Sequence, residues 1–96
     1  MPHYIILFNF TDQGMRNVKD TTKRAEAFKS TIEKAGGKFI SEYYTLGKYH
    51  IVTIVEASND ETILPVILST GSLGNVRSET LKAFSMDEAA KIIERV

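Results

Sequence analysis

The chain has 96 residues, 43% of them hydrophobic, and its twelve lysines and arginines balance twelve aspartates and glutamates. This length predicts one domain over residues 1–96, and the zero net charge excludes a long-range field that would attract nucleic acid or an anionic membrane. The sequence has no cysteine and no apolar run of the roughly 20 residues that span a bilayer, so we expect a cytoplasmic protein without disulfides or thiolate chemistry.

Residues 3–10, HYIILFNF, form the first predicted strand, because they are rich in aromatic and β-branched residues and precede the turn-like TDQG. Apolar side chains fall on both faces of this strand. One face carries Tyr4, Ile6, Phe8 and Phe10, and the other carries Ile5 and Leu7. A strand with two apolar faces is expected at the centre of a sheet and covered on both sides.

The apolar period changes to that of a helix from Asp20 or Thr21 onward. The helical stripe consists of Ala25, Phe28, Ile32 and Ala35. Gly36 and Gly37 end the helix, because glycine adopts the left-handed cap without steric cost.

Residues 38–46 and 49–56 are predicted to form a hairpin with a two-residue type II′ turn at Gly47-Lys48. Counting outward from the turn sets the register. One face pairs Leu46 with Tyr49, Tyr44 with Ile51, Glu42 with Thr53 and Ile40 with Val55; the other pairs Thr45 with His50, Tyr43 with Val52, Ser41 with Ile54 and Phe39 with Glu56.

The second main helix is predicted to begin at the capping box SNDE, residues 58–61. Pro65 requires that this helix either bends or begins nearer Thr62. The glycine-rich GSLGN, residues 71–75, is expected to be a loop, and VRSETLKAF, residues 76–84, a fourth strand. A second capping box, SMDE at residues 85–88, begins a short amphipathic C-terminal helix.

The element order is β-α-β-β-α-β followed by a helix, which is the α+β, ferredoxin-like arrangement of an antiparallel sheet with both main helices on one face. The other face also carries apolar residues on every strand. A second copy of the chain would cover it, so we expect a homodimer. The C-terminal helix, with Met86, Ile92 and Ile93, would permit a larger oligomer.

In this topology the end of the first strand meets the starts of the third and fourth strands at one rim of the sheet. Three loops, TDQG, LGK and GSLGN, are expected to converge there. Their polar and glycine residues and those of the adjoining strand ends form the predicted ligand site: Asn9, Thr11, Asp12, Gly47, Tyr49, His50, Asn75 and Arg77.

His50 has two interpretations. It is either a general acid or base oriented by Asp12 or Glu79, since histidine carries protons near neutral pH, or a packed cross-strand partner of Thr45. His3 is expected about 20 Å away along the antiparallel neighbour, which argues against a two-histidine site within one chain. We therefore assign no metal.

Two other ligand classes are not favoured. GSLGN follows a helix and precedes a strand, whereas phosphate-binding loops follow a strand and open a helix. The third predicted strand, YHIVTIVE, lacks the basic residue, glycine and interleaved aromatics of RNA-recognition domains. We expect no nucleic-acid partner and no cofactor.

LGKYH (residues 46–50) and GSLGNVRSETLKAF (residues 71–84) together resemble the GYD domain family, named for a Gly, Tyr, Asp signature. FNFTDQG, KRAEAF and IVTIVEA extend the resemblance over nearly the whole chain. Relatives are similar to dimeric α+β barrel proteins, in which two ferredoxin-like sheets pack face to face, so the resemblance also implies a homodimer. Gly47 and Tyr49 match the signature, whereas His50 stands where the family name places an aspartate.

The resemblance implies a fold but no general activity. We expect a homodimer that binds a small molecule at the rim around His50. One alternative is a cofactor-free monooxygenase- or isomerase-like enzyme of the dimeric α+β barrel type, with His50 as its catalytic candidate. The other is a purely structural or regulatory dimer.

Overall fold

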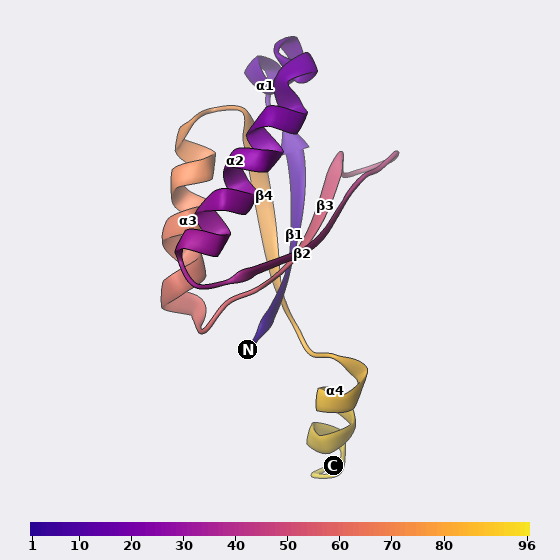
Figure 1. Ribbon diagram of the computed structural model, residues 1–96. Coiled ribbons are helices and arrows are strands. Elements are labelled where there is room, and N and C mark those ends of the chain that lie inside the picture. The colour runs from indigo at the N-terminus through magenta and orange to yellow at the C-terminus, as the bar shows by residue number, and fades with distance from the viewer.

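The computed structural model describes all 96 residues and has the predicted order of main elements, with an additional short helix and a 3-10 turn after the first strand (Figure 1). The strands are β1 (His3–Phe10), β2 (Lys38–Tyr44), β3 (Ile51–Glu56) and β4 (Val76–Ala83). The helices are α1 (Asp12–Arg16), α2 (Thr21–Lys34), α3 (Asp60–Ser72) and α4 (Met86–Ile93), with a 3-10 turn at Val18–Asp20. The strands pair antiparallel in the order β2-β3-β1-β4, which confirms the ferredoxin-like α+β fold.

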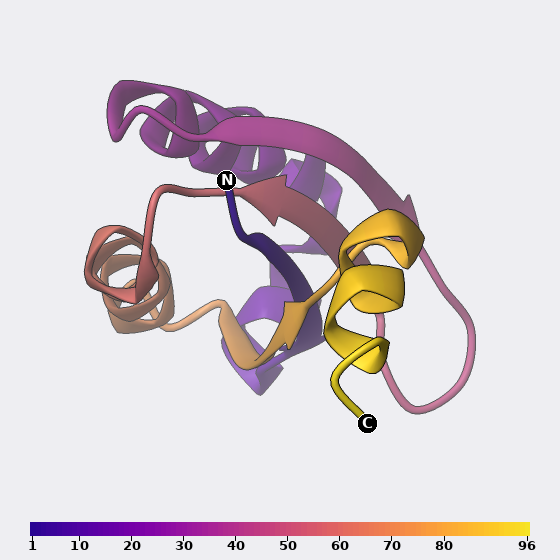
Figure 2. The same ribbon diagram turned by 90° about the horizontal axis from the view of Figure 1, so that it is seen from below.

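The core lies on one side of the sheet, where α2 and α3 cover it (Figure 2). Burial alternates along β1, as its two-sided pattern predicts, so that Tyr4, Ile6 and Phe8 face the helices. Phe28 and Ile32 on α2 pack against them. The rings of Phe28 and Phe8 are arranged edge to face, with their centroids 5.7 Å apart. The opposite side of the sheet has no comparable helical cover.

The connection between β2 and β3 is wider than predicted and comprises residues 45–50. Two hydrogen bonds from Thr45 close this connection. Its N–H donates to the His50 carbonyl at 2.8 Å, and its hydroxyl donates to the Tyr49 carbonyl at 2.6 Å. The prediction of a two-residue turn is wrong. In a continued ladder a backbone N–H would donate to the Tyr49 carbonyl, but here the Thr45 hydroxyl is its donor. Gly47 still needs to be glycine, since its φ of +104° lies in the left-handed region.

The predicted register of this hairpin holds only in its middle. The four pairs from Tyr44 with Ile51 to Ser41 with Ile54 are observed, the two predicted pairs nearest the turn are not part of the ladder, and beyond Ser41 the register shifts. Phe39 pairs with Val55, the residue predicted for Ile40. This bulge is the physical reason for the error, because one extra residue turns Phe39 toward the core and leaves Ile40 50% exposed.

The boundaries of α3 also differ from those predicted. Asn59, not Ser58, is the N-cap, and its side-chain oxygen accepts from the Thr62 N–H at 2.9 Å, so the predicted capping box is wrong. The helix runs through Pro65 in its second turn. It also includes the first two residues of the predicted glycine-rich loop, which leaves only residues 73–75 as the connection to β4.

The C-terminal α4 projects beyond the end of the sheet (Figure 1). Its predicted capping box is confirmed: the Ser85 hydroxyl accepts from the Glu88 N–H at 3.1 Å, and the Glu88 carboxylate accepts from the Ser85 N–H at 2.9 Å. These bonds hold the pKa of Glu88 below its usual value. The His3 ring connects α4 to the sheet, with nitrogens 3.3 Å from Glu88 and 3.4 Å from Glu56.

A buried tyrosine joins β1 to the start of α3. The Tyr4 hydroxyl donates to the Asp60 carboxylate at 2.5 Å, and the Lys82 ammonium lies 3.3 Å from the same oxygen. Burial, and then the Asp60 bond, raise the pKa of Tyr4 to about 12. The same bond and Lys82 hold the pKa of Asp60 below its usual value.

This pairing predicts a loss of stability at alkaline pH. The folded protein holds the Tyr4 proton more tightly than the unfolded chain, whose tyrosine pKa is about 10, so the contribution of Tyr4 is complete below pH 10 and is lost as pH rises toward 12. In urea unfolding between pH 9 and about 12, the wild type should lose more stability than Tyr4→Phe. Parallel pH profiles for the two proteins would contradict this expectation.

Candidate functional site

The predicted rim exists, and hydrogen bonds join its segments. At the end of β1, the Thr11 N–H donates to the Asn75 carbonyl at 3.0 Å and its hydroxyl donates to the Gly74 carbonyl at 2.5 Å. From the β3 side, the His50 N–H donates to the Phe8 carbonyl at 2.9 Å. TDQG and the loop before β4 therefore lie together, whereas the connection between β2 and β3 reaches this rim only through His50.

The segment TDQG is not a turn but the start of α1, so that prediction is wrong. Thr11 is the N-cap, and its hydroxyl accepts from the Gly14 N–H at 3.1 Å. The Gln13 amide nitrogen donates to the Leu73 carbonyl and the Asn75 side chain, each at 3.0 Å. The helix thus lies directly on the loop before β4.

Gly14 allows this close approach. A β-carbon there would lie 1.9 Å from the Asn75 carbonyl oxygen, the atom that accepts from Thr11. Only a residue without a side chain fits. The sequence analysis did not identify this role, because the close contact comes from a segment far along the chain.

His50 is oriented by neither of its predicted partners. Its Nδ1 accepts from the Phe10 N–H at 3.1 Å, and its ring stacks on the Phe10 ring at 5.1 Å. With Nδ1 as the acceptor, neutral His50 carries its proton on Nε2. Neither Asp12 nor Glu79 bonds to the ring; its observed partner is a backbone donor, which sequence patterns do not reveal.

Glu79 instead accepts from the Tyr49 hydroxyl at 2.5 Å, and this bond raises the pKa of Tyr49. The remaining predicted residues spread along the rim. Asp12 is exposed in the first turn of α1, and Asn9 pairs with the exposed Arg77 across β1 and β4. The rim offers polar groups, but most of them face solvent or bond to one another.

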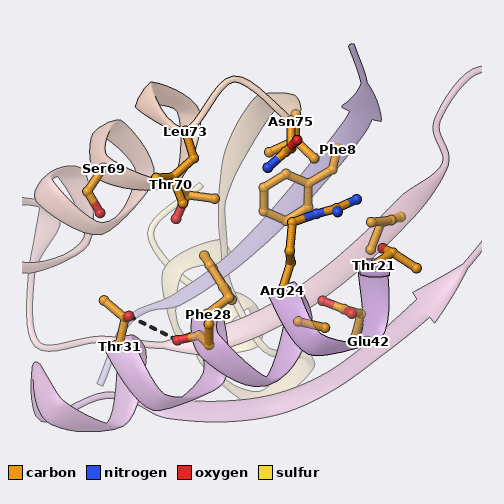
Figure 3. Close-up of a pocket in the computed structure, with 14 residues that line it drawn as sticks. Phe8, Thr21, Arg24, Phe28, Thr31, Glu42, Ser69, Thr70, Leu73 and Asn75 are labelled. Atoms are coloured by element: carbon orange, nitrogen blue, oxygen red, sulfur yellow. Dashed lines mark hydrogen bonds between the residues drawn. The ribbon is translucent and has the colours of Figure 1, made fainter. Parts of the chain in front are cut away.

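A cavity of about 150 Å³ lies elsewhere, between α2, the end of α3 and the helix side of the sheet (Figure 3). Of the predicted site residues, only Asn75 lines it. The other lining residues are Phe8, Thr21, Arg24, Ala25, Ala27, Phe28, Thr31, Glu42, Ile51, Ser69, Thr70, Leu73 and Val76.

Two charged residues of this cavity were missed by the sequence analysis. Arg24 precedes Phe28 by four residues and therefore lies on the core-facing side of α2. Glu42 pairs with Thr53, which is completely buried on the helix side of β3. The sequence could have identified both residues, because a charged side chain at a core-facing position is unusual.

A second cavity of about 360 Å³ lies beside the Tyr4–Asp60–Lys82 cluster, and His50 lines neither cavity. No group of three or more His, Asp or Glu side chains is placed to hold a metal ion. None of the helices is both long enough and apolar enough to cross a membrane.

Comparisons with known proteins agree with this fold. The family model described as GYD domain matches residues 4–93. The chain is 31% identical over 84 residues to a Thermus thermophilus protein named glutamine synthetase and cystathionine beta-lyase binding protein, covering 86% of this chain and 88% of that one.

Several solved structures are similar, among them the following three. TTHA0845 from Thermus thermophilus aligns with a TM-score of 0.57 and 24% identity, over 88% of this chain and 95% of that one. MtbAldR aligns with a TM-score of 0.66 and 10% identity, and this chain spans 52% of its length. FFRP-DM1 aligns with a TM-score of 0.61 and 16% identity over its full length. At these identities the likeness concerns the fold alone.

Proposed function

Because the chain belongs to the GYD domain family, we propose that it is a small binding domain that acts as a homodimer, formed through the uncovered face of its sheet. The name of the Thermus relative, a binding protein, supports a binding role over a catalytic one. The apolar character of the uncovered face carries the proposal.

This face has an apolar centre that no helix of the chain packs against. Ile5 and Leu7 of β1 point away from α2 and α3, since their neighbours on the strand face the core. Their cross-strand partners on this face include Ile54, Val52 and Leu81. A second copy offers a surface of the same chemistry, and symmetric pairing would remove both faces from water.

The exposed area supports such a partner. A compact monomer of this mass exposes about 5,500 Å², whereas this chain exposes 6526 Å². Its radius of gyration is 14.3 Å, against about 12.5 Å for a compact domain of the same length. The excess area is similar to the roughly 800 Å² that each partner buries in a standard interface. The open shape of a single copy, to which the projecting α4 contributes, is in keeping with the proposed dimer.

Light scattering should give twice the chain mass of 10.8 kDa at micromolar concentration. Leu81→Lys should weaken the dimer by at least about 100-fold, because each copy would bury an unpaired ammonium in the interface. Ser78→Lys is the matched control. It adds the same charge to the same strand, but opposite Phe8 on the helix side, and should remain dimeric. A monomeric wild type would contradict the proposal.

The rim around His50 is proposed as a ligand site of this dimer. Its support is the contact of TDQG with the loop before β4, the nearby His50, and the exposed Arg77, which could bind a carboxylate with two parallel hydrogen bonds. We expect a thermal-shift screen of organic acids, quinones and phenols to give a hit that is lost in His50→Ala. Equal shifts in both proteins would place the ligand away from this rim.

A further inference from the structure

The cavity between α2 and α3 contains one cation and one anion that do not neutralise each other. Lys82 forms an ion pair with Asp60, and His3 lies within ion-pair distance of Glu56 and Glu88. Arg24 and Glu42 belong to none of them, although both line the cavity. In Figure 3 the Arg24 guanidinium and Glu42 both lie toward the Thr21 end of the cavity.

The Arg24 guanidinium has N–H donors without an acceptor. Its Nη1 donates to the Asn17 carbonyl at 3.0 Å, whereas its Nη2 is buried and has no acceptor. A buried donor without a partner is unfavourable, and a guanidinium binds a carboxylate with two parallel hydrogen bonds. An incoming carboxylate would therefore meet a positioned and incompletely satisfied cation.

A hydrogen bond from the strand β3 holds Glu42 in place. One of its carboxylate oxygens accepts from the Thr53 hydroxyl at 2.7 Å, and Thr53 is completely buried. The carboxylate has no cationic neighbour within ion-pair distance. It could accept hydrogen bonds from an ammonium group bound beside Arg24.

The rest of the cavity is suited to a short aliphatic chain. Phe8, Phe28, Ile51 and Val76 supply apolar surface on the helix side of the sheet. A volume of about 150 Å³ is comparable to that of apolar cavities that hold benzene. It accommodates three or four carbon atoms in addition to a small polar head.

We propose that this cavity binds a free α-amino acid with a small aliphatic side chain. Arg24 binds its carboxylate, Glu42 binds its ammonium, and the apolar wall holds its side chain. This site shares Asn75 with the rim but does not include His50, and it lies on the other side of the sheet from the proposed dimer face, so variants of His50 and of the dimer face test it independently.

Titration calorimetry of the full chain with three probes tests the assignment. The probes are L-valine, 3-methylbutanoate, which lacks the ammonium, and 2-methylpropan-1-amine, which lacks the carboxylate. L-Valine should bind at least about ten-fold more tightly than either, since each probe omits a charge-assisted hydrogen bond. Arg24→Gln should remove its advantage over the amine, and Glu42→Gln its advantage over the carboxylate.

Two further variants complete the test. Ala25→Leu keeps both charges but fills the cavity, so it should abolish L-valine binding even if a charge variant folds poorly. His50→Ala changes only the rim and should bind L-valine like the wild type. The proposal is overturned if L-valine does not bind at millimolar concentration, if Ala25→Leu and Arg24→Gln bind it normally, or if only His50→Ala loses it.

Discussion

Replacing Gly14 with alanine should lower the free energy of unfolding by about 3 kcal/mol, near the upper end of the usual cost of overpacking. The new β-carbon would lie 1.9 Å from the Asn75 carbonyl oxygen, so α1 would have to move away from the loop before β4. That movement would also stretch the bond from the Thr11 N–H to the same oxygen. Urea unfolding at a fixed protein concentration measures the loss.

Gly71→Ala is the matched control for this change. Gly71 lies in the last turns of α3, and nothing lies within 4 Å of the position that its β-carbon would occupy. Alanine there should be neutral or stabilise the protein by up to about 1 kcal/mol through helix propensity. Equal stability of the two variants would show that the contact between α1 and Asn75 does not constrain the rim.

Replacing Ile32 with alanine should cost about 3 to 4 kcal/mol, as is typical for a buried aliphatic side chain. Ile32 is 1% exposed and belongs to the core cluster under the sheet. Its truncation leaves a cavity between α2 and the strands, and the chain has only 12 buried residues with which to compensate. For a domain of this size, the loss is a large part of a total stability of roughly 5 to 14 kcal/mol.

Leu68→Ala provides the comparison on the other main helix. Leu68 is 62% exposed, so its truncation should change stability by no more than about 0.5 kcal/mol. Both variants are measured by urea unfolding, again at one protein concentration, since a dimer's stability depends on it. A similar loss for Leu68 would mean that its exposed side chain is covered in the assembled protein.

Interactions between near neighbours in the sequence made much of the fold predictable. The alternation along β1, the stripe on α2 and the capping box at Ser85 all depend on residues no more than four positions apart. Two of the errors occurred where a side chain formed a hydrogen bond that the sequence pattern did not indicate. The Thr45 hydroxyl bonds within the wider hairpin connection, and Asn59, not Ser58, is the N-cap of α3.

The sequence predicted which strand ends lie at the rim, but not which contacts their side chains make. Strand direction alone brings Thr11, His50 and Asn75 to one end of the sheet. Which atom orients His50 could not be predicted, because the donor is the backbone N–H of Phe10, a group that every residue except proline has.

The sequence by itself determined the fold family, the order of the strands and main helices, and the two apolar faces of the sheet. The physical reason is that periodicity and capping act over one or two turns of chain. Only the tertiary structure decided that Gly14 must be glycine and that Arg24 and Glu42 share a cavity without pairing. Those features depend on distances between elements far apart in the chain, which are set by packing as a whole.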